Sequence, residues 1–285
     1  MSRHFLASHL AHRADLSPYP ETSGGAYWRF RFVTQHFPTR QLRFFLTAPS
    51  PCPYLPGREE RKVFAHLPML DGAAVNDTLT QGGFRRSQNI AYRPACENCA
   101  ACMSARLPVG NYVFSRSERR VLARNDPLTR HVVEAEATRE QFDVLRGYLA
   151  SRHPGGGMAD MTWPDYVAMV EDTAVRTHMV EYRVRSSDGG PGQLAACALV
   201  DLLADGLSLV YSFFDQEFAR NSPGSFVIFD HVREARRLRL PYLYLGYWVR
   251  GSEKMDYKAR FSPLEILQPA GWRLMSTRDR LREPV

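Results

Sequence analysis

The spacing of apolar residues predicts a helix shortly after residue 130. Thr138 and Gln141 form a capping-box pattern, in which each side chain bonds the backbone of the other residue at a helix start. Phe142, Leu145 and Leu149 follow at the three- and four-residue spacing of one helix face. We therefore expect a helix that opens at Thr138 and packs this face against a core.

A second helix, a hairpin and a third helix are predicted next. Thr162 caps the second helix, with Asp165 in its first turn. Two apolar runs, at residues 194–203 and 207–214, are joined by Ala-Asp-Gly, which is typical of a β-hairpin. Apolar residues then repeat at helical spacing over residues 225–238, with charged residues on the outer face.

The last part of the chain alternates between strand and helix. Residues 242–249 are apolar and aromatic, and they predict a buried strand. We expect Ser252 to cap a short helix that carries Lys254 and Lys258 on one face. A final strand is expected at residues 264–267.

This order of elements resembles that of the acyl-transferring GNAT fold, in which a β-hairpin leads into a helix and then another strand. In that fold, backbone N–H groups at the start of the central helix bind the phosphates of the acyl donor. The corresponding loop here, RNSPGS at residues 220–225, only half matches the glycine-rich loop that binds coenzyme A. The donor therefore need not be coenzyme A.

The N-terminal part of the chain has a different pattern. Residues 1 to about 40 are polar and aromatic, and we expect them to form a loosely structured arm. Strands are predicted at residues 41–48, 61–67 and 103–109. Three prolines in PCPYLPG, at residues 51–57, disfavour regular structure there.

A basic stretch, SRSERRVLARN at residues 115–125, marks a boundary between these two parts. The predicted fold class is α+β. We expect a smaller, mixed α/β N-terminal domain over residues 1–125, which carries a cysteine cluster. A GNAT-like transferase domain is expected over residues 126–285.

The composition indicates a globular protein with a basic surface. The 285 residues are 44% hydrophobic, with 16 Phe and 13 Tyr, so a sizeable core is expected. The formal net charge of +7 favours nucleic acid or other anionic ligands as partners. Three of the 37 basic residues are lysines and the rest are arginines, which makes each lysine notable.

Cysteine usage and hydropathy indicate the compartment. The number of cysteines, five, is odd, and three of them lie within seven residues, which does not suit a disulfide framework. No stretch reaches the ~18 apolar residues that span a bilayer, and the N-terminus lacks the apolar core of a signal peptide. We therefore expect a cytoplasmic protein in a reducing compartment, with no membrane partner.

The stretch QGGFRRSQNIAYRPACENCAAC, at residues 81–102, carries the densest candidate chemistry. It combines three arginines with side-chain amides and a tyrosine, directly before cysteines spaced C-x-x-C-x-x-C. An arginine offers a planar fork of donors that suits a carboxylate or a phosphate. The stretch predicts a site that receives an acidic or phosphorylated partner.

Several motifs along the chain resemble those of the aminoacyl-tRNA–protein transferases. They are RRSQNIAYRPAC at residues 85–96, PCPYLPG at 51–57, YSFFD at 211–215, LGYWV at 245–249 and KMDYKARF at 254–261. The pattern is most similar to the bacterial branch of this family, the aspartate/glutamate leucyltransferases. The resemblance covers roughly residues 40–265.

The resemblance implies an enzyme of the N-degron (N-end rule) pathway. Its donor substrate would be leucyl-tRNA, and its acceptors would be proteins that begin with Asp or Glu. An aminoacyl ester is already activated, so no cofactor is required. Catalysis would consist mainly of positioning the acceptor amine against the ester, with some stabilisation of the oxyanion.

The acidic side chain of such an acceptor needs a cationic partner. The residues expected to bind the acceptor N-terminus are Arg85, Arg86, Gln88, Asn89, Tyr92 and Arg93. The arginines would hold the carboxylate, and the amides would contact neighbouring amine or carbonyl groups. The alternative for each arginine is a structural ion pair with a carboxylate in the core.

The catalytic candidates are Tyr211 and Asp215, of which Asp215 would accept a proton or orient the amine. Phe213 and Tyr247 are candidates for stacking on the terminal adenosine of tRNA or for lining the leucyl pocket. The alternative for both aromatics is an ordinary place in the core.

Three further residues are candidates for binding aminoacyl-tRNA. Ser225 would lie at the start of the central helix, where backbone N–H groups bind phosphate. Lys254 and Lys258 would contact phosphates of the acceptor stem. The alternative for the lysines is a solvated helix face.

A metal site is an open question for the cysteine cluster. Cys52, Cys96, Cys99 and Cys102 would suit zinc or an iron–sulfur cluster, and packed or redox-responsive free thiols are the alternative. Arginyl relatives in eukaryotes carry C-x-x-C near the start, whereas here Leu55 stands three residues after Cys52. This departure puts a bound metal in doubt.

Three other functions remain open from the sequence. The donated amino acid could be arginine rather than leucine. The chain could instead be a GNAT acetyltransferase that uses acetyl-coenzyme A, or a non-catalytic RNA-binding or thiol-sensor module. Transfer of a labelled amino acid from tRNA to a peptide distinguishes an aminoacyltransferase from an acetyltransferase and from a non-catalytic module.

Overall fold

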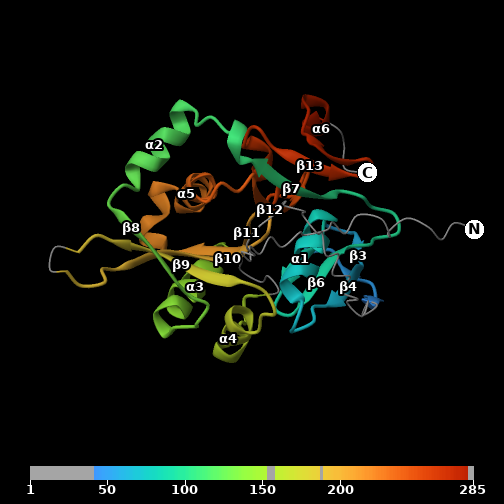
Figure 1. The fold of residues 1–285 in the computed structure, drawn as a ribbon, viewed down its shortest axis with the longest axis horizontal. Coiled ribbons are helices and arrows are strands. Elements are labelled where there is room, and N and C mark those ends of the chain that lie inside the picture. The colour runs from blue at the N-terminus through green and yellow to red at the C-terminus, as the bar shows by residue number, and fades with distance from the viewer. Residues whose placement is uncertain (1–41, 153–157, 187–188, 282–285) are drawn as a thin grey trace, which may run out of the picture. The chain divides into compact units, whose positions relative to one another are not determined.

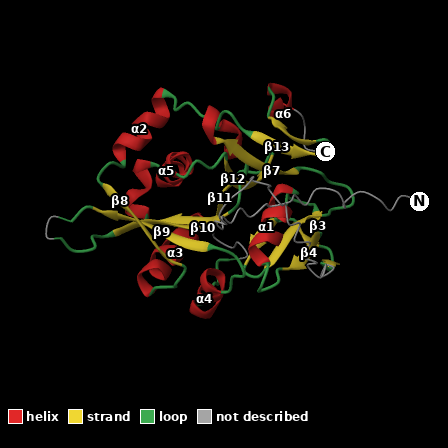
Figure 2. Cartoon of the chain, viewed as in Figure 1, coloured by secondary structure: helices red, strands yellow, loops and turns green. Residues whose placement is uncertain are grey.

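The structure is a computed structural model that describes residues 42–152, 158–186 and 189–281. The expected N-terminal arm lies outside the described residues. Helices and strands of the described part are mixed along the chain, so the α+β class is confirmed. Figure 2 shows these elements by type.

The centre of the fold is an eight-stranded sheet with the order β14-β13-β7-β12-β11-β10-β9-β8. β11 and β12 pair in parallel, and the other neighbours in this sheet pair antiparallel. In chain order its strands are β7 (Cys102–Pro108), β8 (Leu128–Glu134), β9 (Thr177–Val184), β10 (Leu194–Leu202), β11 (Gly206–Phe214), β12 (Tyr242–Val249), β13 (Glu265–Gln268) and β14 (Gly271–Leu274).

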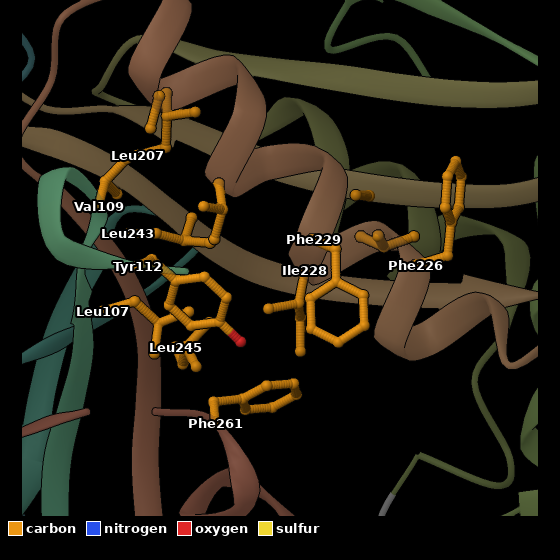
Figure 3. Packing of buried hydrophobic residues seen from close by; sticks show 14 of the residues in the cluster. Leu107, Val109, Tyr112, Leu207, Phe226, Ile228, Phe229, Leu243, Leu245 and Phe261 are labelled. Carbon is orange, nitrogen blue, oxygen red and sulfur yellow. The ribbon is translucent and has the colours of Figure 1, made fainter. Parts of the chain in front are cut away.

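Helices cover both faces of this sheet (Figure 1). α2 (Arg116–Arg124) and α5 (Pro223–Arg237) lie on one face, and α5 packs against β11 and β12. α3 (Arg139–Arg152) and α4 (Trp163–Glu171) lie on the other face. The larger core cluster fills the space under α5, where Ile228 and Phe229 meet Leu107 and Leu245 of the sheet (Figure 3).

Local sequence signals account for where these helices begin. The Thr138 hydroxyl accepts a hydrogen bond from the Gln141 N–H at 3.2 Å, and the Gln141 side chain bonds back to the Thr138 N–H. Thr162 and Asp165 form the same arrangement at the start of α4. Both predicted caps are confirmed, because a capping box depends on residues only three apart.

A smaller sheet of four strands carries the N-terminal motifs. Its order is β1 (Phe44–Leu46), β4 (Lys62–His66), β6 (Ile90–Pro94) and β5 (Arg85–Ser87). α1 (Gly72–Gln81) leads into β5, and β2 (Ser50–Pro51) pairs with β3 (Glu59–Glu60). β5 and β6 form a tight hairpin whose turn is Gln88-Asn89, with Gln88 at a left-handed φ of 52°.

The predicted hairpin over residues 194–214, the helix over 225–238 and the strands over 242–249 and 264–267 are confirmed within a few residues. The helix α1 and the strands β2, β3, β5, β6, β8, β9 and β14 were not predicted. The short helices η1 (Val109–Asn111), η2 (Gln216–Asn221) and α6 (Thr277–Leu281) were also not predicted. β8 and β9 complete one side of the central sheet, so the predicted order after residue 130 lacked two of its strands.

The expected helix after Ser252 is wrong in its position. The structure has η3, a 3₁₀-helix that spans Asp256–Arg260, so Lys254 precedes it and Lys258 lies within it. Lys254 is exposed, whereas Lys258 is buried. The two lysines therefore do not share a helix face, because the four-residue rule applies only along a continuous α-helix.

The proposed boundary at residue 125 stays a prediction. β7, which precedes that boundary, lies in the central sheet between β12 and β13. Residues 42–285 cluster as one compact unit. The parts of the chain before and after residue 125 therefore both contribute strands to the central sheet. Within the described part of the chain, no helix is long and apolar enough to cross a membrane.

Candidate active site

The candidate site lies where β11 and β12 separate. The two strands pair only from Gly206 to Ser208 and from Tyr242 to Tyr244. Beyond this point β12 continues along β7, with an irregularity in register next to Gly246. The backbone of β11 beyond Ser208 is thus left without β12 as its neighbour. We call the surroundings of this separation the divergence site.

Arg85 reaches into the divergence site from the small sheet. Its Nη2 donates a hydrogen bond to the Val210 carbonyl of β11 at 2.9 Å. Its guanidinium lies against Gly246 of β12 and 5.8 Å from the centre of the Tyr247 ring. Arg85 therefore bridges the two strands where they no longer bond each other.

Lys258 approaches the same part of β12 from η3. Its side chain is buried, with a relative exposure of 4%, and its Nζ donates to the Tyr247 carbonyl at 2.5 Å. Burial, together with the charge of Arg85, holds the pKa of Lys258 well below its usual range. Among the described residues, no carboxylate forms an ion pair with Lys258 or with Arg85.

Tyr257 lies next to Lys258 in η3, with its ring centre 5.7 Å from the Lys258 Nζ, and is 40% exposed. Burial and the neighbouring Tyr148 raise its pKa, and the charges of Arg85, Arg260 and Arg152 oppose that rise. The guanidinium of Arg260 also lies 5.4 Å from the centre of the Tyr257 ring. The positive charges of three arginines, from β5, α3 and η3, therefore act on one tyrosine.

The start of α5 lies beside this basic group. Ser222 precedes α5 in a left-handed conformation and makes no side-chain cap. Arg260 reaches Ser225, in the first turn of α5, with 3.4 Å between Nη2 and Oγ. The first N–H groups of a helix carry partial positive charge and suit an anionic ligand. Ser225 is therefore at the place that the sequence predicted.

Arg86 makes a structural ion pair. Its Nε and Nη2 each donate to the Asp201 carboxylate at 2.7 Å, and both side chains are 1% exposed. Its Nη1 donates to the Gln88 carbonyl at 2.8 Å. The donor fork of Arg86 is thus occupied within the chain, which is the structural alternative left open from the sequence.

The other acceptor candidates separate around the small sheet. Tyr92 lies directly across from Arg85 and its carbonyl accepts a hydrogen bond from the Tyr247 hydroxyl at 2.9 Å. Arg93 is exposed, 5.3 Å from the Phe84 ring. Gln88 and Asn89 are half-buried in the β5–β6 turn. Arg85 and Tyr92 are thus the members of this group that the structure brings to the divergence site.

The catalytic candidates lie on β11 and just after it. Burial, and then Tyr148, raises the pKa of Tyr211, so its phenol stays protonated. Asp215 follows β11 and caps η2, with 3.0 Å from the Glu217 N–H to its Oδ1. Tyr211 lies on β11 beyond the last residue that pairs with β12, and its ring packs near Phe213, whereas Asp215 follows the end of the strand.

The two aromatic candidates, Phe213 and Tyr247, are buried in the core, which was the alternative given for them from the sequence. Phe213 is 1% exposed and packs in one cluster with Tyr166 and Cys197. Tyr247 is 2% exposed, and its hydroxyl lies 3.1 Å from the Gly83 carbonyl in addition to its bond with Tyr92. Tyr247 is part of the divergence site, because its carbonyl accepts a hydrogen bond from Lys258 and its ring lies near the guanidinium of Arg85.

The cysteine cluster lines a cavity of about 710 Å³ whose wall also includes Tyr247. Cys52, Cys96, Cys99 and Cys102 all line it and are half-buried. Burial, followed by the nearby thiols, raises the pKa of Cys102 to about 12. No group of three or more His, Cys, Asp or Glu side chains in the described ranges is arranged to hold a metal ion. This arrangement does not fit a metal centre.

Four residues of the divergence site were not predicted: Tyr148, Arg152, Tyr257 and Arg260. Tyr257 and Arg260 belong to the KMDYKARF motif, in which Lys254 and Lys258 were the predicted site residues. Tyr148 and Arg152 lie on the predicted helix at a spacing of four, which would have placed them on one face. Nothing local to α3 indicates which part of the sheet that face meets.

Comparisons with known proteins agree with the motifs. Two family models match the chain: the C terminus of arginine-tRNA-protein transferase over residues 140–268, and its N terminus over residues 50–120. The aspartate/glutamate leucyltransferase of Phenylobacterium zucineum is 76% identical over 247 residues, which cover 87% of this chain and 96% of that protein. That of Caulobacter vibrioides is 72% identical over 252 residues, covering 88% and 90%.

Among solved structures, the crystal structure of FemX matches with a TM-score of 0.43 at 10% identity. That match covers 65% of this chain and 62% of FemX. The match to the C-terminal domain of a lysylphosphatidylglycerol synthetase from Agrobacterium fabrum has a TM-score of 0.39 at 18% identity, covering 56% and 53%.

Proposed function

This chain belongs to the arginine-tRNA-protein transferase family, and we propose that it is a leucyltransferase that modifies proteins beginning with Asp or Glu. The donor is leucyl-tRNA, and the product is the same protein extended by one leucine at its N-terminus. The observation that carries this conclusion is 76% identity to an aspartate/glutamate leucyltransferase over 87% of the chain. By the logic of the N-end rule, the product is marked for degradation.

The reaction exchanges one bond for another. The neutral α-amine of the acceptor attacks the ester carbonyl of leucyl-tRNA, and a C–N bond forms. The C–O bond to the terminal ribose breaks, and the proton lost by the amine ends on the released ribose hydroxyl. The pKa of a free α-amine is about 7.7–8.0, so a sizeable minority of acceptors is already neutral near pH 7. Positioning of the amine against the ester supplies most of the acceleration.

Arg85 is the residue proposed to bind the acidic side chain of the acceptor. It is half-buried and has no carboxylate partner in the described part of the chain. Its hydrogen bond to Val210 uses Nη2, which leaves the Nε and Nη1 donors to bond a carboxylate. Arg86 does not share this role, because Asp201 occupies its donor fork.

The start of α5 and the arginines around Tyr257 are proposed to hold the 3′ end of the tRNA. Arg260 and Arg152 would contact its phosphates, and the first N–H groups of α5 would add to that attraction. The exposed ring of Tyr257 offers a surface on which the terminal adenine stacks. The Tyr257 ring would thus bind the neutral adenine, and the arginines would bind the charged phosphates of the tRNA.

The protonated phenol of Tyr211 is proposed to donate a hydrogen bond to the oxyanion that forms on the ester carbonyl. Because its pKa is raised, the phenol does not act as a base near pH 7. Asp215 keeps one carboxylate oxygen, Oδ2, that is free of the cap bond and can accept the amine proton. Both substrates are components of the cytoplasm, so we propose that the enzyme works there.

The decisive experiment supplies tRNA charged with labelled leucine or labelled arginine to a peptide that begins with Asp. We expect leucine, and not arginine, to appear at the N-terminus of the peptide. Acetyl-coenzyme A is offered in a parallel reaction to test the acetyltransferase alternative. Transfer of arginine, acetylation of the peptide, or no transfer from either tRNA would overturn the proposal.

A further inference from the structure

The half-buried Arg85 and the buried Lys258 differ from the buried arginines of the fold. Arg86 is paired with Asp201, and Arg106 with Glu265. In the described ranges, Arg85 and Lys258 have no carboxylate partner, although both contact Tyr247. Arg85 donates to the Val210 carbonyl, and Lys258 donates to the Tyr247 carbonyl and the Met255 sulfur; none of these acceptors carries a net charge.

Holding Arg85 and Lys258 both in their charged forms, without a counter-ion, would be costly. Removing a charge from water without a counter-ion costs several kcal/mol, and a second like charge adds to that cost. The fold places both groups there and leaves the negative partner out. The missing negative charge is therefore expected to come from a ligand.

We propose that Lys258 and Arg85 together bind the side-chain carboxylate of the acceptor's first residue. This inference rests on the proposed function and names the part of the site that selects Asp and Glu. Arg85 supplies a planar fork and Lys258 a point charge on the other side of the carboxylate. An acceptor that begins with Asn or Gln brings an amide of the same shape without the charge.

A lysine suits the buried position because it can lose its proton, whereas an arginine stays charged. The pKa of Lys258 is lowered by burial first and by the Arg85 guanidinium second. The groups that face Lys258 are Arg85 from β5, Cys102 from β7 and the Tyr247 carbonyl from β12. Its own η3 adds Tyr257, whose ring centre is 5.7 Å from Nζ.

Binding of the acceptor is therefore coupled to a proton. In the free enzyme, the neutral amine of Lys258 avoids a second buried charge beside Arg85. A carboxylate between the two groups favours the ammonium form, so the pKa of Lys258 rises when Asp or Glu binds. Binding of an acceptor that begins with Asp or Glu is therefore accompanied by uptake of a proton. Binding of an acceptor that begins with Asn or Gln is not.

The substitution test compares Lys258→Met with Lys254→Met. Methionine keeps the length and apolar character of the buried lysine stem, and Lys254 is an exposed lysine four positions earlier. We expect Lys258→Met to lower kcat/KM for a peptide starting with Asp at least about tenfold more than for one starting with Asn. Lys254→Met should leave that ratio unchanged.

Equal losses on the two peptides in Lys258→Met would overturn the inference, because a purely structural lysine affects both alike. In that case leucine transfer to Asp peptides by the unaltered enzyme would still stand, so the two proposals fail separately. No transfer to any peptide by the unaltered enzyme would instead remove the function itself.

Calorimetry on the unaltered enzyme tests the inference even if Lys258→Met does not fold. Binding of the Asp and Asn peptides is measured in two buffers with different ionisation enthalpies, near neutral pH. We expect the Asp peptide to take up more protons on binding than the Asn peptide, whose α-amine is the same. Equal proton uptake by the two peptides would contradict the two-cation site.

Discussion

The guanidinium of Arg85 occupies the space that a side chain at Gly246 would need. A Cβ atom at residue 246 would lie 2.2 Å from Nη1 of Arg85 and 2.3 Å from its Cζ. Gly246 also has a φ of 74°, which a residue with a Cβ adopts only with strain. The glycine in β12 therefore allows the arginine of β5 to enter the divergence site.

Gly246→Ala is expected to displace Arg85 and impair acceptor binding. Leucine transfer to a peptide starting with Asp should fall at least about tenfold, and the free energy of unfolding should fall by about 1–3 kcal/mol. Steady-state kinetics and chemical denaturation measure the two effects. Gly110→Ala is the control, because a Cβ there meets nothing within 4 Å. Undiminished transfer by Gly246→Ala would show that Arg85 does not need this space.

Arg85 and Arg86 are neighbours in sequence with opposite expected roles. Arg86→Met leaves the buried carboxylate of Asp201 without a partner and should cost about 3–5 kcal/mol of unfolding free energy. Any loss of activity should be the same for peptides starting with Asp and with Asn. Arg85→Met should cost little stability but reduce the preference for Asp over Asn. A selective loss in Arg86→Met with unchanged stability would reverse these assignments.

These two arginines also show what the sequence could predict. The motif placed a carboxylate-binding arginine in the correct stretch, but it could not distinguish Arg85 from Arg86. The partner of Arg86, Asp201, lies 115 positions away along the chain. Only the pairing of β5 with the rest of the fold decides which guanidinium is occupied and which reaches the divergence site.

Elements were predicted where their signals are local. The capping boxes at Thr138 and Thr162 are complete within three residues, and both helices are present. β9 was missed because polar residues interrupt its apolar run. One of them, Glu181, is buried, and Gln141 of α3 donates to it at 2.8 Å. A buried polar residue satisfied by a distant partner has no signature in its own segment.

A helix glycine offers a stabilising substitution. Gly147 lies within α3, is exposed, and has open space where a Cβ would be added. Gly147→Ala should raise the free energy of unfolding by about 0.5–1 kcal/mol, because alanine loses less backbone entropy in a helix. Gly72→Ala, at the start of α1, should destabilise instead, since its Cβ would lie 2.3 Å from the Ala174 carbonyl oxygen. Urea denaturation of both variants tests the contrast.

His231 makes the stability of the fold depend on acid pH. It is fully buried in α5, its Nδ1 donates to the Val227 carbonyl at 2.7 Å, and burial lowers its pKa from 6.5 to about 4. The charges facing it, Asp230 and Glu234 against Arg130, only partly offset burial. The unfolded chain therefore binds the proton more readily, and stability falls as pH drops from 6.5 to about 4. The loss should reach about 3 kcal/mol. His231→Leu should flatten this part of the denaturation profile, and parallel profiles of the two proteins would refute the role.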